Sequence, residues 1–246
     1  MKFDHPAFAP YRELVTVLGL ARALPSIDAL NAVADARNTV QARGLPLRFF
    51  VPAGRLSARE YETGILATGR VPTRADNWHD MLNALVWLRF PRFKATLNAA
   101  HGEAIALESG TRREPRRDAL TMLDESGVWV AGGDPALLAL LAERAWHALF
   151  WDARAKLEES TLFVVVGHAL LEKALTPFPA MTGKCLTLTG QWRGLDALET
   201  AATQALAGIV TPRQLPPLPI QGIPRWDTAN DCADYYANRE IFRPPA

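Results

Sequence analysis

The sequence predicts an α/β or α+β fold, in which helices pack on a small mixed sheet within a single compact domain. Three observations support this expectation. Apolar residues recur at helical spacing in several segments, and short runs rich in valine lie between them. Of the 246 residues, 49% are hydrophobic, which is enough to bury a sizeable core. No apolar run approaches the roughly 20 residues of a membrane span, so no membrane partner is expected.

The first half of the chain is predicted to be mainly helical. Ser26 and Ser57 are expected N-caps because each precedes apolar residues at helical spacing, and Glu60 completes a capping box with Ser57. Pro91 fits the first turn of a helix and therefore predicts a bend rather than one long rod. In chain order we expect helices over 10–43 with a break at Pro25, a strand over 47–51, a helix over 57–67, a loop over 69–74, and helices over 76–90 and 91–108.

Strands and helices alternate in the second half. Residues 118–132 fit either a helix or a hairpin, and the hairpin is favoured because Gly127 follows a polar turn sequence and precedes the strand-like run 128–130. Asp134 and Pro135 are typical of a helix N-cap and first helical position. The other expected elements are a helix over 134–150, a buried strand over 161–166, a helix of about eight residues from His168, a strand over 185–189 and a helix over 195–209.

The composition divides the chain into a main globular domain over 1–210 and a Pro-rich aromatic tail over 211–246. The last 35 residues hold seven of the 18 prolines, together with Trp226, Tyr235 and Tyr236. Because large aromatic side chains favour burial, we expect the tail to pack on the main domain rather than to be a free linker.

The charges are balanced, with 27 basic and 26 acidic residues, so no global field attracts a polyanion. A basic loop over 110–117 carries Arg112, Arg113, Arg116 and Arg117. No aromatic residue is interleaved with them, so a solvated loop is favoured over nucleic-acid binding.

Two features bear on the cellular compartment. Cys185 and Cys232 are interpreted as reduced thiols, with a single disulfide between them as the alternative. The N-terminal residues include an acid and a proline where a signal peptide has a basic and then an apolar region. A cytoplasmic location is therefore expected, while the oligomeric state stays open.

Polar residues interrupt an otherwise apolar helix in segment 77–87. At helical spacing His79, Asp80 and Asn83 share one face. Among such apolar neighbours, these groups must bond to one another, to a ligand or to a metal. The alternative is a capping and hydrogen-bonding role near the helix N-terminus. We interpret His79 and Asp80 as candidate catalytic residues and Asn83 as a candidate substrate-binding residue.

Further candidates lie beyond the predicted bend. Lys94, Asn98 and His101 share one face of the next helix, where a solvated surface is the simpler explanation, and Lys94 is retained as a candidate substrate-binding residue. Arg117 could clamp a carboxylate or phosphate, and Asp118 could fix that arginine or bind a cation.

A second informative stretch begins where the predicted strand over 161–166 ends. Gly167 and His168 follow this strand, and the carboxyl ends of strands are frequent ligand sites. His168 and Glu172 are four residues apart on the following helix, so they could share one metal, or the carboxylate could orient the imidazole. A histidine bonded to a backbone carbonyl is the competing interpretation.

Common catalytic motifs are absent: the chain has no GxGxxG after a strand, Walker loop, GxSxG elbow or HExxH. The adjacent residues His79 and Asp80 are similar to the His-Asp pair of metal-dependent phosphohydrolases. Those enzymes build the site with further histidines, and the only histidine upstream of His79 in this chain is His5. Asp124 and Glu125 are interpreted as plain turn residues.

Several blocks together resemble a bacterial protein family of unknown function, over the chain from about residue 45 to the end. The blocks that carry the resemblance are W-H-D-x-x-N-A-L-V-W-x-x-F-P over 78–91, G-H-A-L-L-E-K over 167–173, R-D-A-L-T over 117–121, D-E-S-G over 124–127 and the closing I-F-R-P over 241–244. Phe93 departs mildly from the threonine or serine expected there. The resemblance implies no transferable activity.

The first functional hypothesis is an enzyme, most simply a hydrolase, that acts on a small polar or phosphorylated metabolite. His79 and Asp80 would meet His168 and Glu172 in one pocket, with or without a divalent metal as cofactor. A metal or reacting atom shared by the two histidines requires them to lie within about 8 Å of each other around a cleft. The alternative is a non-catalytic module that binds a ligand or a protein in the same pocket.

Overall fold

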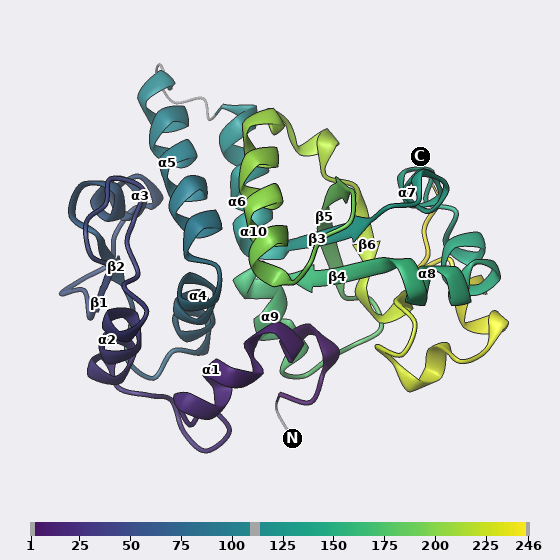
Figure 1. Ribbon diagram of the computed structural model, residues 1–246, viewed down its shortest axis with the longest axis horizontal. Coiled ribbons are helices and arrows are strands. Elements are labelled where there is room, and N and C mark those ends of the chain that lie inside the picture. The colour runs from purple at the N-terminus through teal and green to yellow at the C-terminus, as the bar shows by residue number, and fades with distance from the viewer. Residues whose placement is uncertain (1–2, 109–113, 245–246) are drawn as a thin grey trace.

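The computed structural model describes residues 3–108 and 114–244. Its central feature is a four-stranded mixed sheet with helices packed around it (Figure 1). The strands are β3 (Gly127–Gly132), β4 (Thr161–Val165), β5 (Thr182–Thr189) and β6 (Pro217–Pro219), in the order β4-β3-β5-β6. β3 and β5 are parallel, while β4 and β6 run antiparallel to their neighbours. This arrangement confirms the predicted class, a single domain with a small mixed sheet.

Helices form most of the remaining structure, and α3, α4 and α5 lie on one side of the sheet in Figure 1, with α7 and α8 on the other. A second sheet consists of two short parallel strands, β1 (Arg48–Phe50) and β2 (Arg70–Pro72). The helices are α1 (Arg12–Val17), α2 (Ile27–Ala36), α3 (Ala58–Thr68), α4 (Trp78–Arg89), α5 (Pro91–Leu107), α6 (Pro115–Ser126), α7 (Pro135–Ala142), α8 (Arg154–Ser160), α9 (His168–Ala174) and α10 (Leu195–Ala205), preceded by the 3-10 turn η1 (Pro6–Tyr11).

The predicted helix starts and the predicted bend are confirmed. Ser26 caps α2 by accepting a hydrogen bond from the backbone of Ala29, and Ser57 and Glu60 form the expected capping box at α3. Helix α4 ends at Arg89 with Phe90 as its C-cap, and α5 begins at the next residue, Pro91. These elements were predictable because each depends on residues that are close together in the chain.

The hairpin predicted over 118–132 is wrong, because this segment continues α6 and then forms β3. Helix α6 buries Arg117, Leu120 and Leu123, which lie three residues apart and so share a helical face. The turn interpretation requires a left-handed Gly127, but its φ and ψ are −65° and 139°, which is extended backbone. The true neighbours of β3 in the sheet are β4 and β5.

Three further expectations need correction. The loop expected over 69–74 contains β2, which at three residues is too short to show an alternating pattern. The helix expected over 134–150 is interrupted at Arg144, whose φ is 52°, and resumes before the π turn η2 (Ala148–Asp152). The strand over 161–166 is not fully buried, because β4 is at the edge of the sheet and leaves Leu162 exposed.

Residues 211–246 contribute a strand to the sheet. β6 pairs with β5, and 3-10 turns follow it around the end of the sheet. The indole nitrogen of Trp146 donates a hydrogen bond to the backbone oxygen of Arg243 at 2.8 Å, and the Tyr236 hydroxyl donates to the backbone oxygen of Gly222 at 3.1 Å. The turn η4 (Pro212–Gln214) precedes β6, and the turns that follow β6 are η5 (Ile220–Gly222), η6 (Thr228–Asn230) and η7 (Ala233–Ala237).

The two cysteines do not form a disulfide, in line with their interpretation as reduced thiols. Cys185 is buried, Cys232 is exposed, and both are free thiols. Within residues 3–108 and 114–244, every helix is too short or too polar to cross a membrane.

Two glycines allow the end of α6 to touch the start of α9. The backbone oxygen of Gly127 accepts hydrogen bonds from the backbone N–H groups of Val166 and Gly167, both at 2.9 Å. A Cβ atom on Gly167 would lie 2.4 Å from the nitrogen of Gly127 and 2.5 Å from the Cα of Ser126. Only glycine therefore fits at position 167, and this contact fixes where α9 begins relative to α6.

We expect the substitution Gly167→Ala to destabilise the protein by about 1–3 kcal/mol, the usual cost of forcing an extra methyl group into a packed contact. Urea denaturation followed by circular dichroism measures the change. Gly64→Ala is the matched control, since a Cβ there meets nothing within 4 Å in the interior of α3, and it should stabilise the helix slightly. Equal stability of the two variants would contradict this prediction.

Candidate functional site

Helices α3, α4, α5, α6 and α9 surround a cavity of about 500 Å³. The loop before α3 and the loop before α4 complete its wall. The polar and charged side chains that line it are Arg55, Ser57, Tyr61, Glu62, Arg74, His79, Asp80, Asn83, His101, Arg117, Thr121, Asp124, Glu125 and His168. A wall with so many polar groups is suited to a polar ligand.

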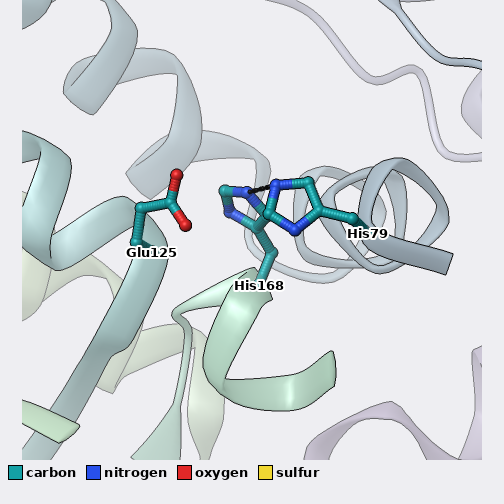
Figure 2. A group of neighbouring side chains, drawn as sticks. All are labelled: His79, Glu125 and His168. Carbon is teal, nitrogen blue, oxygen red and sulfur yellow. Dashed lines mark hydrogen bonds between the residues drawn. The ribbon is translucent and has the colours of Figure 1, made fainter. Parts of the chain in front are cut away.

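Two histidines meet at the centre of this cavity wall. His79 is the second residue of α4, His168 is the first residue of α9, and their Nε2 atoms are 2.9 Å apart (Figure 2). The ring centroids are 4.4 Å apart, and the rings are inclined by 73°. This separation is well below roughly 8 Å, the largest distance at which we expected the two histidines to share a metal or a reacting atom.

The other ring nitrogen of each histidine faces a hydrogen-bond acceptor. His79 Nδ1 is 2.9 Å from Oε2 of Glu172, and His168 Nδ1 is 2.7 Å from the backbone oxygen of Asp124. An ionised carboxylate and a backbone carbonyl can only accept hydrogen bonds, so each Nδ1 carries the proton. When both rings are neutral, each presents an unprotonated Nε2, and the two lone pairs lie at hydrogen-bond distance with no proton between them.

His168 is held in its neutral form by its surroundings. The side chain is 5% exposed, and burial lowers the pKa of His168 to about 4, against an opposing contribution from the negative charge of Asp124. A proton shared between the two Nε2 atoms is therefore unfavourable on the His168 side at neutral pH.

Glu125 supplies a third group beside the histidines. Its carboxylate, on the last turn of α6, faces the imidazoles in Figure 2, and one ligand atom from each of the three residues lies within 4.8 Å of the others. Burial raises the pKa of Glu125, and the charge of Asp124 adds to this effect. Two imidazoles and a carboxylate form a set that binds divalent transition metals.

Asp124 forms a buried ion pair with Lys94, from α5. Burial alone would raise the pKa of Asp124, but the positive charge of Lys94 outweighs this effect, with His168 adding to it, and the pKa falls to about 2. The Lys94 ammonium also lies 5.4 Å from the centre of the Trp87 ring. Lys94 is thus committed to Asp124 and lies behind the cavity rather than in its wall.

Asp80 and Asn83 line the cavity, but their side chains are largely engaged. The Asp80 carboxylate accepts hydrogen bonds from the guanidinium of Arg74 at 2.8 Å and from the Arg74 backbone N–H at 2.7 Å. Asn83 donates a hydrogen bond to the Tyr61 hydroxyl at 2.7 Å. Among the described residues, the buried Oδ1 of Asn83 has no hydrogen-bond partner, so it can accept one from a ligand.

Arg117 lines the cavity, whereas Asp118 is not part of its wall. The Arg117 guanidinium donates to both carboxylate oxygens of Glu108, at 2.8 and 3.0 Å. Arg116 pairs with Glu103 at 3.4 Å on the surface. The other two arginines of the basic loop, Arg112 and Arg113, lie outside the described residues.

The polar face of α5 is buried, contrary to the simpler explanation as a solvated surface. Lys94, Asn98 and His101 are each less than 5% exposed. Asn98 donates hydrogen bonds to the carboxylate of Glu62 at 2.6 Å and to its backbone oxygen at 2.9 Å. Burial raises the pKa of Glu62, and the negative charge of Asp124 adds to this effect, so that the pKa reaches about 7.

Sequence reasoning missed Glu62 and Tyr61, and it assigned Glu125 to a turn. Reading 115–126 as a helix would have placed Arg117, Thr121 and Glu125 at four-residue intervals on one face, which is the face that lines the cavity. No comparable local pattern distinguishes Glu62, because its neighbours at the site come from α5 and α6.

The lowered pKa of His168 predicts a pH-dependent stability in metal-free protein. An unfolded histidine takes up a proton near pH 6.5, but the folded state does so only near pH 4. The free energy of unfolding should therefore decrease as the pH falls from 6.5 to 4, by up to about 3 kcal/mol from this group.

Urea denaturation with a chelator present, at several pH values, measures this dependence. His168→Gln should flatten the curve in that range relative to the unsubstituted protein. His147→Gln, which removes a half-exposed histidine, is the control and should leave the curve unchanged. The prediction fails if the two variants behave alike.

No curated protein and no solved structure matches this chain. A family model does match: that of the family described as "Protein of unknown function (DUF3025)", over residues 47–246. The match includes every residue of the cavity wall. The chain therefore belongs to the DUF3025 family of proteins of unknown function.

Proposed function

We propose that this protein is a metal-dependent hydrolase of small polar or phosphorylated metabolites. His79, His168 and Glu125 would hold one divalent metal ion, and the cavity beside them would bind the substrate. The two free thiols support a cytoplasmic location, and the balanced charge, which gives no basic field, argues against a nucleic-acid partner.

One observation carries this proposal. The Nε2 atoms of His79 and His168 are 2.9 Å apart, and both Nδ1 protons are already donated elsewhere. Two facing lone pairs repel unless a positive charge lies between them. A proton is one choice, and the hydrogen-bond distance between the two Nε2 atoms allows it, although burial disfavours a charge on His168. A metal ion satisfies both lone pairs without requiring either ring to become charged.

The distances fit a metal after a small adjustment. Zn–N bonds of 2.0–2.1 Å at a tetrahedral angle separate two nitrogen ligands by about 3.3 Å, so the rings need to move apart by only a few tenths of an ångström. Glu125 has to approach further, and its long side chain can do so by rotating. Two histidines and one glutamate are also the ligand set of several catalytic zinc sites, which keep a further position open.

Both histidines have the second contact that is typical of metal ligands. A ligating imidazole usually donates its other N–H to a carboxylate or a backbone carbonyl, which fixes the ring orientation and raises ligand basicity. Glu172 does this for His79, and the Asp124 carbonyl does it for His168. In this proposal Glu172 is a positioning residue rather than a metal ligand.

Hydrolysis is the reaction class that fits this site best. A divalent metal with three protein ligands can activate water at neutral pH and polarise an ester or phosphoryl oxygen. Arg55 at the cavity wall would add positive charge for an anionic substrate. A non-catalytic ligand-binding module needs the same cavity, so the activity assay decides between the two.

We expect purified protein to bind close to one equivalent of zinc, manganese or iron, detected by inductively coupled plasma mass spectrometry after dialysis. His79→Ala and His168→Ala should each abolish stoichiometric binding, because a carboxylate and one imidazole hold such ions weakly. Glu172→Gln should weaken the affinity by about 10–100-fold, the usual effect of losing a partner of a ligating histidine. His147→Ala is the matched control and should retain the metal.

The same preparations should be assayed with p-nitrophenyl phosphate, bis(p-nitrophenyl) phosphate and p-nitrophenyl acetate. Hydrolysis that is lost with the metal and restored by adding it supports the enzyme. Binding of metal without any hydrolysis would favour the non-catalytic module. Absence of metal from the unsubstituted protein, even after addition of excess ion, would refute the proposed site.

A further inference from the structure

We infer that Glu62 is the proton-transfer residue of this site, accepting a proton from the attacking water and returning it to the leaving group. This inference rests on the proposed hydrolase function. As the water oxygen bonds to the phosphorus or carbonyl carbon, its proton passes to the Glu62 carboxylate. The bond to the leaving oxygen then breaks, its electron pair stays on that oxygen, and Glu62 returns the proton there. No other reactant is consumed.

Glu62 has a position suited to this role. It lies on α3 and lines the main cavity. It also lines a narrow chamber that adjoins this cavity and is bordered by α5 and α6. Its side chain is largely buried, and Asn98 holds one carboxylate oxygen at 2.6 Å. The backbone oxygen of Glu62 accepts from the same amide at 2.9 Å, so the side chain is held by a neutral donor.

The absence of a cationic partner distinguishes Glu62 from the other acids of the cavity. Asp80 is paired with Arg74, Asp124 is paired with Lys94, and Glu125 is assigned to the metal. Among the described residues, Glu62 forms no ion pair with a lysine or arginine. A largely buried carboxyl group without a cation is costly to ionise, and that cost makes it an effective proton acceptor.

The electrostatic surroundings keep Glu62 able to change its protonation near neutral pH. Burial and the charge of Asp124 raise its pKa to about 7, while Asn98, Lys94 and Arg117 act in the opposite direction. A general base is most effective when its pKa is close to the working pH. The titratable groups that line the cavity or the chamber together with Glu62 are Arg55, Tyr61, Arg74, His79, Asp80, Lys94, His101, Arg117, Asp124, Glu125 and His168.

A purely structural role for Glu62 is the competing explanation. Its two hydrogen bonds with Asn98 join α3 to α5, and that joint could be the whole reason for the residue. Glutamine has the same shape and can accept the same hydrogen bond, but it cannot take up a proton. Glu62→Gln therefore separates the two roles without removing the contact.

The first test follows the Glu62 carboxyl group by carbon-13 NMR in protein labelled at the glutamate side-chain carboxyl carbon. The signal that is missing from Glu62→Gln identifies the residue. In metal-free protein it should titrate near pH 7, and adding one equivalent of zinc should lower the midpoint by about one unit, because a divalent charge enters the same cavity. Glu103→Gln, which changes an exposed glutamate on α5, is the matched control.

The second test compares hydrolysis of whichever p-nitrophenyl probe the unsubstituted protein cleaves. Glu62→Gln should retain full zinc content but lose roughly 100- to 10,000-fold in kcat/KM, and the acidic limb of its pH profile should disappear. Glu103→Gln should keep both the rate and the profile. Full activity of Glu62→Gln would overturn the inference and indicate the structural role.

The outcomes separate this inference from the proposed function. If zinc binds and the probe is cleaved, but the Glu62 midpoint does not move with zinc, only the role of Glu62 is refuted. If the unsubstituted protein binds no metal, the proposed function and the role of Glu62 are refuted together. A loss of zinc from Glu62→Gln would also refute the inference, because it would make Glu62 part of the metal site.

Discussion

The contact between Gly127 and Gly167 is the constraint on which the site depends. One carbonyl oxygen, that of Gly127, accepts both backbone hydrogen bonds that tie the end of β4 to the end of α6. Because no Cβ atom separates the two segments, the last turn of α6 lies directly against the first residue of α9. The carbonyl of Asp124 thereby reaches the His168 ring. The orientation of that imidazole is thus a consequence of backbone packing, with no need for a dedicated side chain.

The charges around the cavity are arranged in local pairs that leave its centre free. Asp80 is neutralised by Arg74, Asp124 by Lys94, and Arg117 by Glu108. Each pair holds two neighbouring segments together. The two buried pairs, Asp124 with Lys94 and Arg117 with Glu108, favour one arrangement of the elements over others, although they add little net stability. The two imidazoles, Glu125 and the carboxyl group of Glu62 belong to none of these three pairs.

Much of this structure could be predicted from local patterns. Ser26, Ser57 and Pro91 mark helix boundaries because capping and proline geometry involve neighbouring residues. The four-residue spacing of His168 and Glu172 suggested that the carboxylate orients the His168 ring, but Glu172 instead contacts His79 from α4, and His168 contacts the backbone oxygen of Asp124. The hairpin prediction failed because a polar sequence that ends in glycine fits a turn as well as the last turn of a helix. That error also concealed Glu125. Glu62 could not be found at all, since its significance comes from Asn98 and Asp124, which are remote in the chain.

The three residues assigned to the metal lie on α4, α6 and α9, which meet only in the complete tertiary structure. In the unfolded chain they are separated by long segments, and loop-closure entropy opposes bringing them together. Uptake of the proposed metal would therefore follow folding rather than start it, as it does in zinc fingers, and would proceed through the mouth of the cavity. Nitrogen and oxygen sites favour divalent ions in one common order of affinity. The identity of a metal bound at this proposed site would therefore depend on which ions the surrounding compartment supplies to the folded protein.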